Sequence, residues 1–224
     1  MLSDVQIERY SRQLILTEVG GRGQQALLSG RVAVLGTEQA STATALYLAA
    51  AGVGTVHVSE AAAHAAAGLN PDVHLVDRGT VNCPDVIDAL LGRCDVAICA
   101  NAAPALCLAV NDAAIHHAIP LVCAAADGSV VWVAVFAGHD RRAACYRCAL
   151  PDLPAASDRT SGGIAAVAAG LAGTLAATAA TNMLLRRTGT PVSRLTVHAL
   201  CEATVRAVDV AKNPTCLACA MERA

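Results

Sequence analysis

Short apolar runs alternate with longer segments rich in alanine and leucine through the first half of the chain. The apolar runs have the length and composition of buried strands and lie at residues 31–35, 55–59, 73–77, 95–99 and 120–125. The segments between them carry proline only at a first position and predict helices at residues 40–51, 61–67, 84–92 and 104–118. This alternation indicates the α/β class, a mostly parallel sheet with helices on both faces.

The pattern changes after the turn Asp127-Gly128. The apolar run at 129–137 follows this tight turn, so we expect it to pair antiparallel with a neighbouring strand. The remaining predicted elements are a linker without periodicity at 151–160, a long helix that ends near Leu185, and two terminal strands at 190–199 and 204–210 that form an antiparallel C-terminal extension.

The first 30 residues predict a helical arm. An amphipathic helix is expected from Asp4 to Leu16, with Ser3 or Asp4 as its N-cap. Glycines at positions 20, 21 and 23 are expected to end it, and a short helix at 24–28 leads into the first strand.

Composition narrows the class of protein. The 224 residues are 55% hydrophobic and 15% charged, which excludes a disordered chain. Aromatic residues make up only 2%, so the core must be built from Ala, Val, Leu and Ile. A formal net charge of −2 gives no support for a nucleic-acid or anionic-membrane partner.

The first residues and the ten cysteines indicate the cellular compartment in which we expect the protein. The first residues are polar and charged, so no signal peptide is predicted, and we expect a cytoplasmic protein with reduced or metal-bound thiols. The uncharged run at 162–185 is long enough to cross a bilayer. Because it consists mostly of Ala, Gly and Thr, we interpret it as a buried helix and keep a membrane span as the alternative.

Two CxxC pairs carry the sharpest chemical signal. Four thiolates at this spacing can close a tetrahedral zinc site without an open position, which is a structural site. The alternative is two unrelated buried or redox pairs. The candidate ligands are Cys145, Cys148, Cys216 and Cys219.

We therefore expect one domain over residues 1–224. It would comprise the N-terminal arm at 1–30, a Rossmann-like core at 31–137 and a zinc-pinned C-terminal part at 138–224.

The strand, turn, helix and strand at 31–60 match the βαβ unit that opens a dinucleotide-binding fold. Gly36 ends the first strand, and Glu60 follows the second strand, where a carboxylate could reach ribose hydroxyls. The glycine fingerprint of the turn is incomplete, because Glu38 and Ser41 stand at its second and third positions. The second glycine lets a phosphate approach the backbone, and the third lets helix and strand pack closely. Glu38 adds both a side chain and a negative charge at the second position.

Several segments together resemble the ThiF/MoeB/HesA family of ubiquitin-activating-type adenylyltransferases. The resemblance covers nearly the whole chain and is carried by ERYSRQLIL at 8–16, GGRGQQALLSGRVAVLG at 20–36, LYLAAAGVGTVHV at 46–58, AIPLVCAAADGSVVWVAVF at 118–136, and the segments CYRC at 145–148 and NPTCLAC at 213–219.

This resemblance implies a Rossmann-like sheet, a dimer paired through long helices and the two CxxC pairs as zinc ligands. It also implies adenylation of the C-terminal glycine of a small ubiquitin-like carrier with ATP and magnesium. Arg12 matches the family arginine that reaches into the partner subunit's nucleotide site and contacts phosphate. The alternative for Arg9 and Arg12 is a solvated helix face.

The chain departs from the family at the nucleotide site. The family's loop after the second strand, with its Asp, Asn-Leu-x-Arg-Gln and Lys, is shortened to an alanine-rich stretch at 61–68. Lys212 is the one lysine of the chain, and Ala102 stands where the magnesium-binding Asp belongs. Asn101 or Asp127 would have to bind a metal by another route.

The cysteines outside the CxxC pairs do not supply a nucleophile in this interpretation. The family's nucleophilic Cys has no counterpart at 158–163. We expect Cys123 and Cys201 to be ordinary buried cysteines. His116 and His117 are expected to diverge, as adjacent helix residues do, and not to serve one site.

Three functions remain open at this point. The first is a pseudoenzyme with a degraded ATP site that binds an active paralogue, a ubiquitin-like sulfur carrier or a peptide, in sulfur transfer or natural-product assembly. It would form a homodimer or a heterodimer. The second is an active adenylyltransferase with a rearranged site. The third, an NAD-type oxidoreductase, faces the same incomplete glycine fingerprint and shows no His/Lys/Tyr catalytic set.

Overall fold

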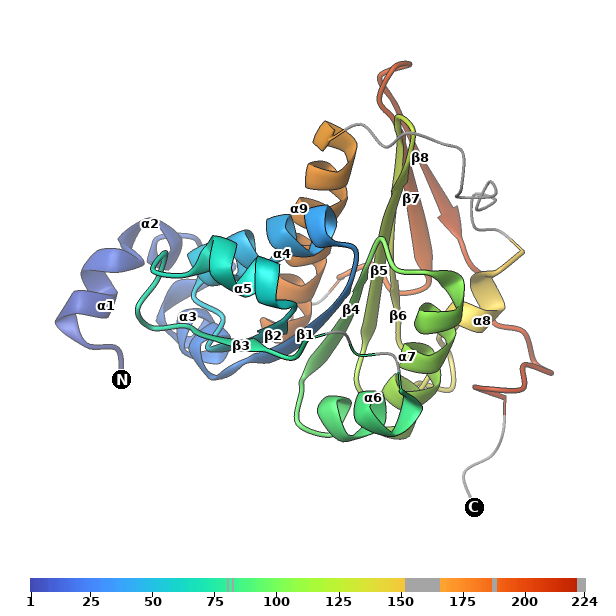
Figure 1. The fold of residues 1–224 in the computed structure, drawn as a ribbon, viewed down its shortest axis with the longest axis horizontal. Coiled ribbons are helices and arrows are strands. Elements are labelled where there is room, and N and C mark those ends of the chain that lie inside the picture. The colour runs from blue at the N-terminus through green and yellow to red at the C-terminus, as the bar shows by residue number, and fades with distance from the viewer. Residues whose placement is uncertain (80, 82, 152–165, 187–188, 221–224) are drawn as a thin grey trace.

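The computed structural model describes residues 1–79, 81, 83–151, 166–186 and 189–220. Within these residues, one eight-stranded sheet has the order β3-β2-β1-β4-β5-β6-β7-β8 (Figure 1). The strands are β1 (Arg31–Gly36), β2 (Thr55–Val58), β3 (His74–Asp77), β4 (Val96–Ala100), β5 (Leu121–Asp127), β6 (Val130–Phe136), β7 (Arg194–Ala199) and β8 (Thr204–Asp209).

The sheet is parallel from β3 to β5 and antiparallel from β5 to β8. The order β3-β2-β1-β4-β5 is that of a dinucleotide-binding fold, with the topological switch between β1 and β4. The predicted fold class, a Rossmann-like sheet with an antiparallel extension, is therefore confirmed.

Helices cover both faces of the sheet. They are α1 (Asp4–Arg9), α2 (Ser11–Leu14), α3 (Gly20–Ser29), α4 (Glu38–Ala51), α5 (Glu60–Ala66), α6 (Pro84–Leu91), α7 (Pro104–His116), α8 (Tyr146–Ala149) and α9 (Ala166–Leu184). In Figure 1, α4, α5 and α9 lie on one side of the sheet and α6, α7 and α8 on the other.

Each face of the sheet has its own core, because successive strand residues point to opposite faces. On β1, Val32 and Val34 pack with α4, α5 and α9, whereas Ala33 and Leu35 pack with α6 and α7. The buried runs seen in the sequence are thus strands covered on both sides, as parallel sheets require.

Small residues let α9 pack closely on the rest of its layer. A Cβ on Gly173 would lie 2.4 Å from the Ala40 carbonyl oxygen of α4. Among the described helices, α9 is the one that is long and apolar enough to cross a membrane by length and composition. It contacts α4, β4, β5 and β6.

The scarcity of aromatic residues leaves a single tryptophan in the sheet. Trp132 is half-buried on β6, where it pairs with Ala125 of β5 and Val197 of β7. It therefore lies at the junction between the parallel strands and the antiparallel extension.

The N-terminal arm differs from its prediction. The single helix expected at 4–16 is broken at Tyr10, whose backbone leaves the α region and whose side chain is buried. The glycines expected to end that helix instead lie within α3, which begins at Gly20. A Cβ on Gly23 would lie 2.9 Å from a Leu185 methyl group, so glycine here allows close packing on the region after α9.

The expected linker at 151–160 lies outside the described residues, apart from Pro151, which is in a turn. The stretch at 158–163, where the family's nucleophilic cysteine was sought, also lies outside them.

Candidate nucleotide site and cysteine cluster

Gly36 forms the end of β1 at the switch point of the sheet. Its φ is +147°, and a Cβ there would lie 1.9 Å from the carbonyl oxygen of Ala100 on β4. The Thr37 N–H donates to the same oxygen at 3.0 Å. The close approach of β1 and β4 therefore requires glycine at this position, whether or not a ligand binds.

Helix α4 begins directly after this turn. Thr37 occupies its N-cap position and Glu38 is its first residue. The N-terminus of a helix attracts anions such as phosphate. Ser41, which stands at the third glycine position, is buried, and its hydroxyl has no hydrogen-bond partner.

Glu60 follows β2, as predicted, two residues after the end of the strand. It is the first residue of α5 and is exposed, with no hydrogen bond or ion pair to any described residue. Helix α5 packs against α4 and leads through residues 67–73 to β3. The connection between β2 and β3 thus consists of one short helix and a turn.

The residues directly after β4 are buried against the sheet. Asn101 has a positive φ of 53° and is buried, and its Oδ1 accepts the Ala126 N–H at 3.3 Å. Ala102 is buried and offers no metal-binding atom in its side chain. Asp127 ends β5, three positions beyond the residue that pairs with Ala100.

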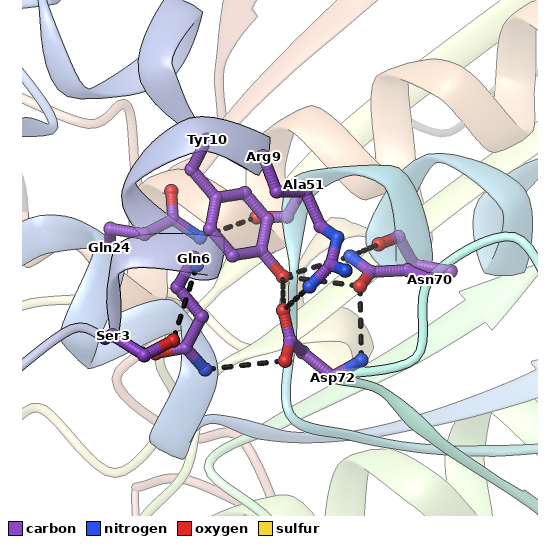
Figure 2. Close-up of polar contacts among 9 residues, drawn as sticks. Ser3, Gln6, Arg9, Tyr10, Gln24, Ala51, Asn70 and Asp72 are labelled. Atoms are coloured by element: carbon purple, nitrogen blue, oxygen red, sulfur yellow. Dashed lines mark hydrogen bonds and ion pairs between the residues drawn. The ribbon is translucent and has the colours of Figure 1, made fainter.

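The ERYSRQ segment anchors the arm to the turn before β3 (Figure 2). The Tyr10 hydroxyl donates to Asp72 at 3.0 Å and accepts from Asn70 Nδ2 at 2.9 Å. The Arg9 guanidinium pairs with the Asp72 carboxylate, and Gln6 Nε2 donates to the same group at 3.3 Å. Burial raises the pKa of Tyr10, so its hydroxyl stays protonated as a donor.

Arg12 does not join this network. It lies on α2, exposed, and makes no hydrogen bond or ion pair with any part of the chain that the structure describes. The two arginines that the sequence grouped therefore differ, since Arg9 holds the arm in place and Arg12 projects from the surface.

The four CxxC cysteines come together between α8 and the C-terminal tail. The Sγ–Sγ distances are 3.8 Å for Cys145–Cys148, 3.7 Å for Cys145–Cys216 and 3.5 Å for Cys148–Cys219. Four ligands at a Zn–S distance of about 2.3 Å in a tetrahedron are roughly 3.8 Å apart. The described sulfurs therefore fit a tetracysteine zinc site.

Local hydrogen bonds prepare this cluster for a cation. Burial opposes ionisation of Cys216, but backbone N–H groups of Ala218 and Cys219 and the neighbouring thiols lower its pKa to about 7. Burial raises the pKa of Cys145 and Cys219, and a bound metal ion would favour their thiolate forms. Asn213 N–H also donates to Cys148 Sγ at 3.5 Å.

Lys212, the one lysine, belongs to this C-terminal region and not to the β1–α4 turn. Its Nζ donates to the carbonyl oxygens of Asp140 at 3.4 Å and Ala143 at 3.2 Å. It thus fixes the tail to the loop that precedes Cys145.

A second thiol cluster lies inside the core. Cys99 of β4, Cys107 of α7 and Cys123 of β5 have sulfurs within 4.8 Å of one another, and all three are buried. Burial and thiol contacts raise the pKa of Cys99 and Cys123, so both act as small apolar side chains. The prediction that Cys123 is buried is confirmed. The same prediction for Cys201 is wrong, because this residue lies in the exposed turn of the β7–β8 hairpin.

The structure corrects the expectation for His116 and His117. Both rings contact one carboxylate oxygen of Asp88 on α6, and their centroids are 4.6 Å apart. His116 is the last residue of α7 and His117 is its C-cap, with φ −86° and ψ 4°. The divergence expected of adjacent helix residues does not hold where the helix ends.

Three comparisons place these features among known proteins. The family model described as "ThiF family" matches residues 59–218. The SAMP-activating enzyme E1 of Haloferax volcanii is 30% identical over 97% of this chain and 90% of its own length. The sulfur carrier protein ThiS adenylyltransferase of Escherichia coli is 30% identical over 82% of this chain and 83% of its own length.

Among solved structures, Escherichia coli MccB in complex with MccA-N7isoASN has the same fold. The TM-score is 0.79 at 14% sequence identity, over 98% of this chain and 76% of that chain.

Proposed function

The chain belongs to the ThiF family, and we propose that it is a member without self-sufficient adenylation that works by binding a partner protein. The partner would be an active paralogue, a ubiquitin-like sulfur carrier or a peptide, in sulfur transfer or natural-product assembly. The names of the relatives, adenylyltransferases and activating enzymes of sulfur carriers, support this range of partners. We place this role in the cytoplasm, where ten thiols stay reduced.

The start of α4 carries the proposal. A triphosphate at the switch point of this sheet would meet the N-terminus of α4. That helix begins with Glu38, and like charges close together in a partly dry site repel by several kcal/mol, as an order of magnitude.

Other described residues also support a site that does not bind a triphosphate. Thr37 N–H and the Asn101 side chain are engaged with backbone groups of the sheet. Ala102 replaces a carboxylate, and Lys212 is held at the tetracysteine cluster. Gly36 is accounted for by strand packing, so its presence does not argue for a retained ligand.

The zinc that we assign to Cys145, Cys148, Cys216 and Cys219 has a structural role in this proposal. Four thiolate ligands leave no open position for chemistry, so the ion would hold the tail against α8. Dimer formation, with Arg12 supplied to the nucleotide site of an active partner, would give the exposed arginine a use.

One observation favours the second candidate, an active adenylyltransferase with a rearranged site. Relatives named as activating enzymes and adenylyltransferases are 30% identical over 82–97% of the chain. Such an enzyme would have to bind Mg-ATP without the lost contacts. Asp127 at the end of β5 is the carboxylate that would then have to bind the magnesium ion by another route.

ATP–pyrophosphate exchange with purified protein and a carrier that ends in Gly-Gly separates the two candidates. We expect no exchange above background, and no heat of Mg-ATP binding by calorimetry. Robust exchange by the protein alone would establish the active enzyme and end our proposal.

A Glu38→Gly variant tests the cause. Removing the carboxylate should raise nucleotide affinity measurably. Glu18→Gln, outside the helices of the arm, is the charge control and should leave affinity unchanged. Equal nucleotide affinity in wild-type and Glu38→Gly protein would show that the acidic residue is not what excludes phosphate.

A further inference from the structure

Asp88, His116 and His117 form a side-chain cluster on the layer of α6 and α7, away from the β1–α4 turn. His116 Nδ1 lies 2.9 Å from Asp88 Oδ1, and His117 Nε2 lies 3.0 Å from the same oxygen. The three possible ligand atoms are all within 4.8 Å of one another. Two imidazole nitrogens and one carboxylate oxygen thus face a common point.

The way in which the rings converge follows from the end of α7. His116, still helical, uses the near nitrogen of its ring, and His117, outside the helix, uses the far nitrogen. A Cβ on Gly92 would lie 3.0 Å from His117 Cε1, so the glycine at the end of α6 leaves room for this ring. The end of α7 and the contacts with Asp88 therefore bring both rings together in the absence of a ligand.

Exposure and charge suit an ion that enters from solvent. The side chains of His116, Asp88 and His117 are 68%, 44% and 24% exposed. The hydrogen bond from His116, with further help from His117, lowers the pKa of Asp88, so the carboxylate is anionic at neutral pH. His116 also lines a cavity of about 510 Å³ whose wall includes Cys219.

We propose that Asp88, His116 and His117 form a second metal site, which binds a divalent transition-metal ion such as Zn²⁺ or Ni²⁺. Two histidines and a carboxylate are a ligand set that these ions accept, with the remaining positions open to water. The site shares no ligand with the tetracysteine cluster, whose thiolates prefer softer metal ions.

Nickel titration of protein already loaded with zinc at its tetracysteine cluster tests the site. Calorimetry should show one Ni²⁺ bound per chain. His116→Gln and His117→Gln should each weaken binding by at least about tenfold, which is what loss of even an indirect partner of a metal ligand costs. His74→Gln, an exposed histidine at the start of β3, is the matched control and should bind as wild type does.

A spectrum with Co²⁺ distinguishes the two metal sites. Nitrogen and oxygen ligands give weak visible bands, and binding at Asp88, His116 and His117 should show only these. Intense sulfur-to-cobalt charge-transfer bands without the weak ones would mean exchange at the cysteines and would overturn the proposal. So would absence of Ni²⁺ binding, or equal loss of binding in His74→Gln.

Folding of the variants is checked by circular dichroism and thermal unfolding. Ni²⁺ should raise the melting temperature of the wild type but not that of His117→Gln, because only a ligand that binds the native state stabilises it. If the Asp88 contacts serve only to join α6 to α7, Ni²⁺ will leave the wild-type melting temperature unchanged and the proposal fails.

Discussion

At the scale of single residues, the positions of the glycine fingerprint serve different needs. Gly36 is required by the contact of β1 with the Ala100 carbonyl group, independently of any nucleotide. Glu38 and Ser41 stand where only a ligand or a closely packed strand would demand glycine. The backbone alone therefore explains Gly36, whereas glycine at the other two positions would depend on a ligand or on helix packing.

Gly36→Ala should destabilise the fold severely. The added Cβ meets backbone rather than a flexible side chain, so β1 and β4 must separate, which we expect to cost more than about 2 kcal/mol of unfolding free energy. Chemical denaturation measures this. Gly21→Ala in α3, where no atom lies within 4 Å, should be neutral or stabilising, and equal losses in both variants would contradict the explanation.

The Asp72 carboxylate should make stability depend on pH. Burial opposes its ionisation, but hydrogen bonds from Gln6, Tyr10 and Arg9 lower the pKa of Asp72 below its unfolded value. Its contribution is therefore complete above the unfolded pKa of about 3.9 and disappears as pH falls through the lower, folded pKa.

We expect Asp72→Asn to be less stable than wild type at pH 7, by about 1 kcal/mol, as for a partly exposed ion pair. The difference should shrink as pH falls below about 4. Denaturation at a series of pH values is the measurement, with Glu202→Gln in the exposed β7–β8 turn as charge control. A difference that stays constant from pH 7 to pH 3 would argue against the Asp72 hydrogen bonds as its cause.

At the scale of elements, periodicity was sufficient for the strands and helices of the sheet but not for the arm. The buried runs such as 31–35 and 95–99 predicted β1 and β4, because strands covered on both faces are continuously apolar. The break at Tyr10 could not be predicted, since it depends on Asn70 and Asp72, some 60 residues away. The glycines at 20, 21 and 23 resemble a helix end locally, but they lie within α3, and Gly23 allows close packing against Leu185.

The same limit applies to the candidate sites. The spacing of the CxxC pairs predicted the tetracysteine cluster, because two intervening residues let both sulfurs face one point. The Asp88–His116–His117 cluster was missed, since it requires knowing that α7 ends at His116. Contact between Cys99 and Cys123 depends on the pairing of β4 with β5, which the sequence does not specify.

Removing the metal from the tetracysteine cluster should release the C-terminal tail without unfolding the sheet. The tail beyond β8 is joined to Cys145 and Cys148 through Cys216 and Cys219, and to the loop that precedes Cys145 through Lys212. Cys216→Ser, or treatment with a strong chelator, should lower the melting temperature and make residues 211–220 sensitive to protease.

Limited proteolysis with mass spectrometry would locate the cleavage. Cys201→Ser is the control, because that thiol is exposed in a turn and belongs to no cluster within the described residues. Resistance of the Cys216→Ser tail equal to that of wild type would show that the cysteines do not hold it.

At the scale of the whole molecule, the two arginines of the arm have different surroundings. Arg9 is used internally, and Arg12 is left at the surface, where a second subunit could receive it. The assignment of one domain, with its arm, core and metal-pinned part, remains a prediction, as do the dimer and the vestigial contacts of Gly36 and Glu60. The strand order itself follows from the family fold.

Arg12→Ala should therefore affect activity only in an assembly. In a mixture of this chain with an intact paralogue, we expect the variant to lower ATP–pyrophosphate exchange by at least about tenfold, since an arginine supplied across an interface contributes strongly to phosphate chemistry. Its melting temperature should equal that of wild type. Arg9→Ala should show the reverse, lower stability through loss of the Asp72 pair. Full exchange in the Arg12→Ala mixture would exclude the assigned role.

The position of Trp132 also decides what optical experiments on this molecule can detect. As the sole indole, half-buried on β6 beside Ala125 and Val197, it dominates intrinsic emission and senses its surroundings at the junction of the parallel and antiparallel strands. Detachment of the arm, which packs on the core of the opposite face, would leave its signal nearly constant. If the arm unfolds before the sheet, far-ultraviolet dichroism should show a transition that Trp132 fluorescence does not. A difference between the two unfolding curves would then report loss of the arm's helices.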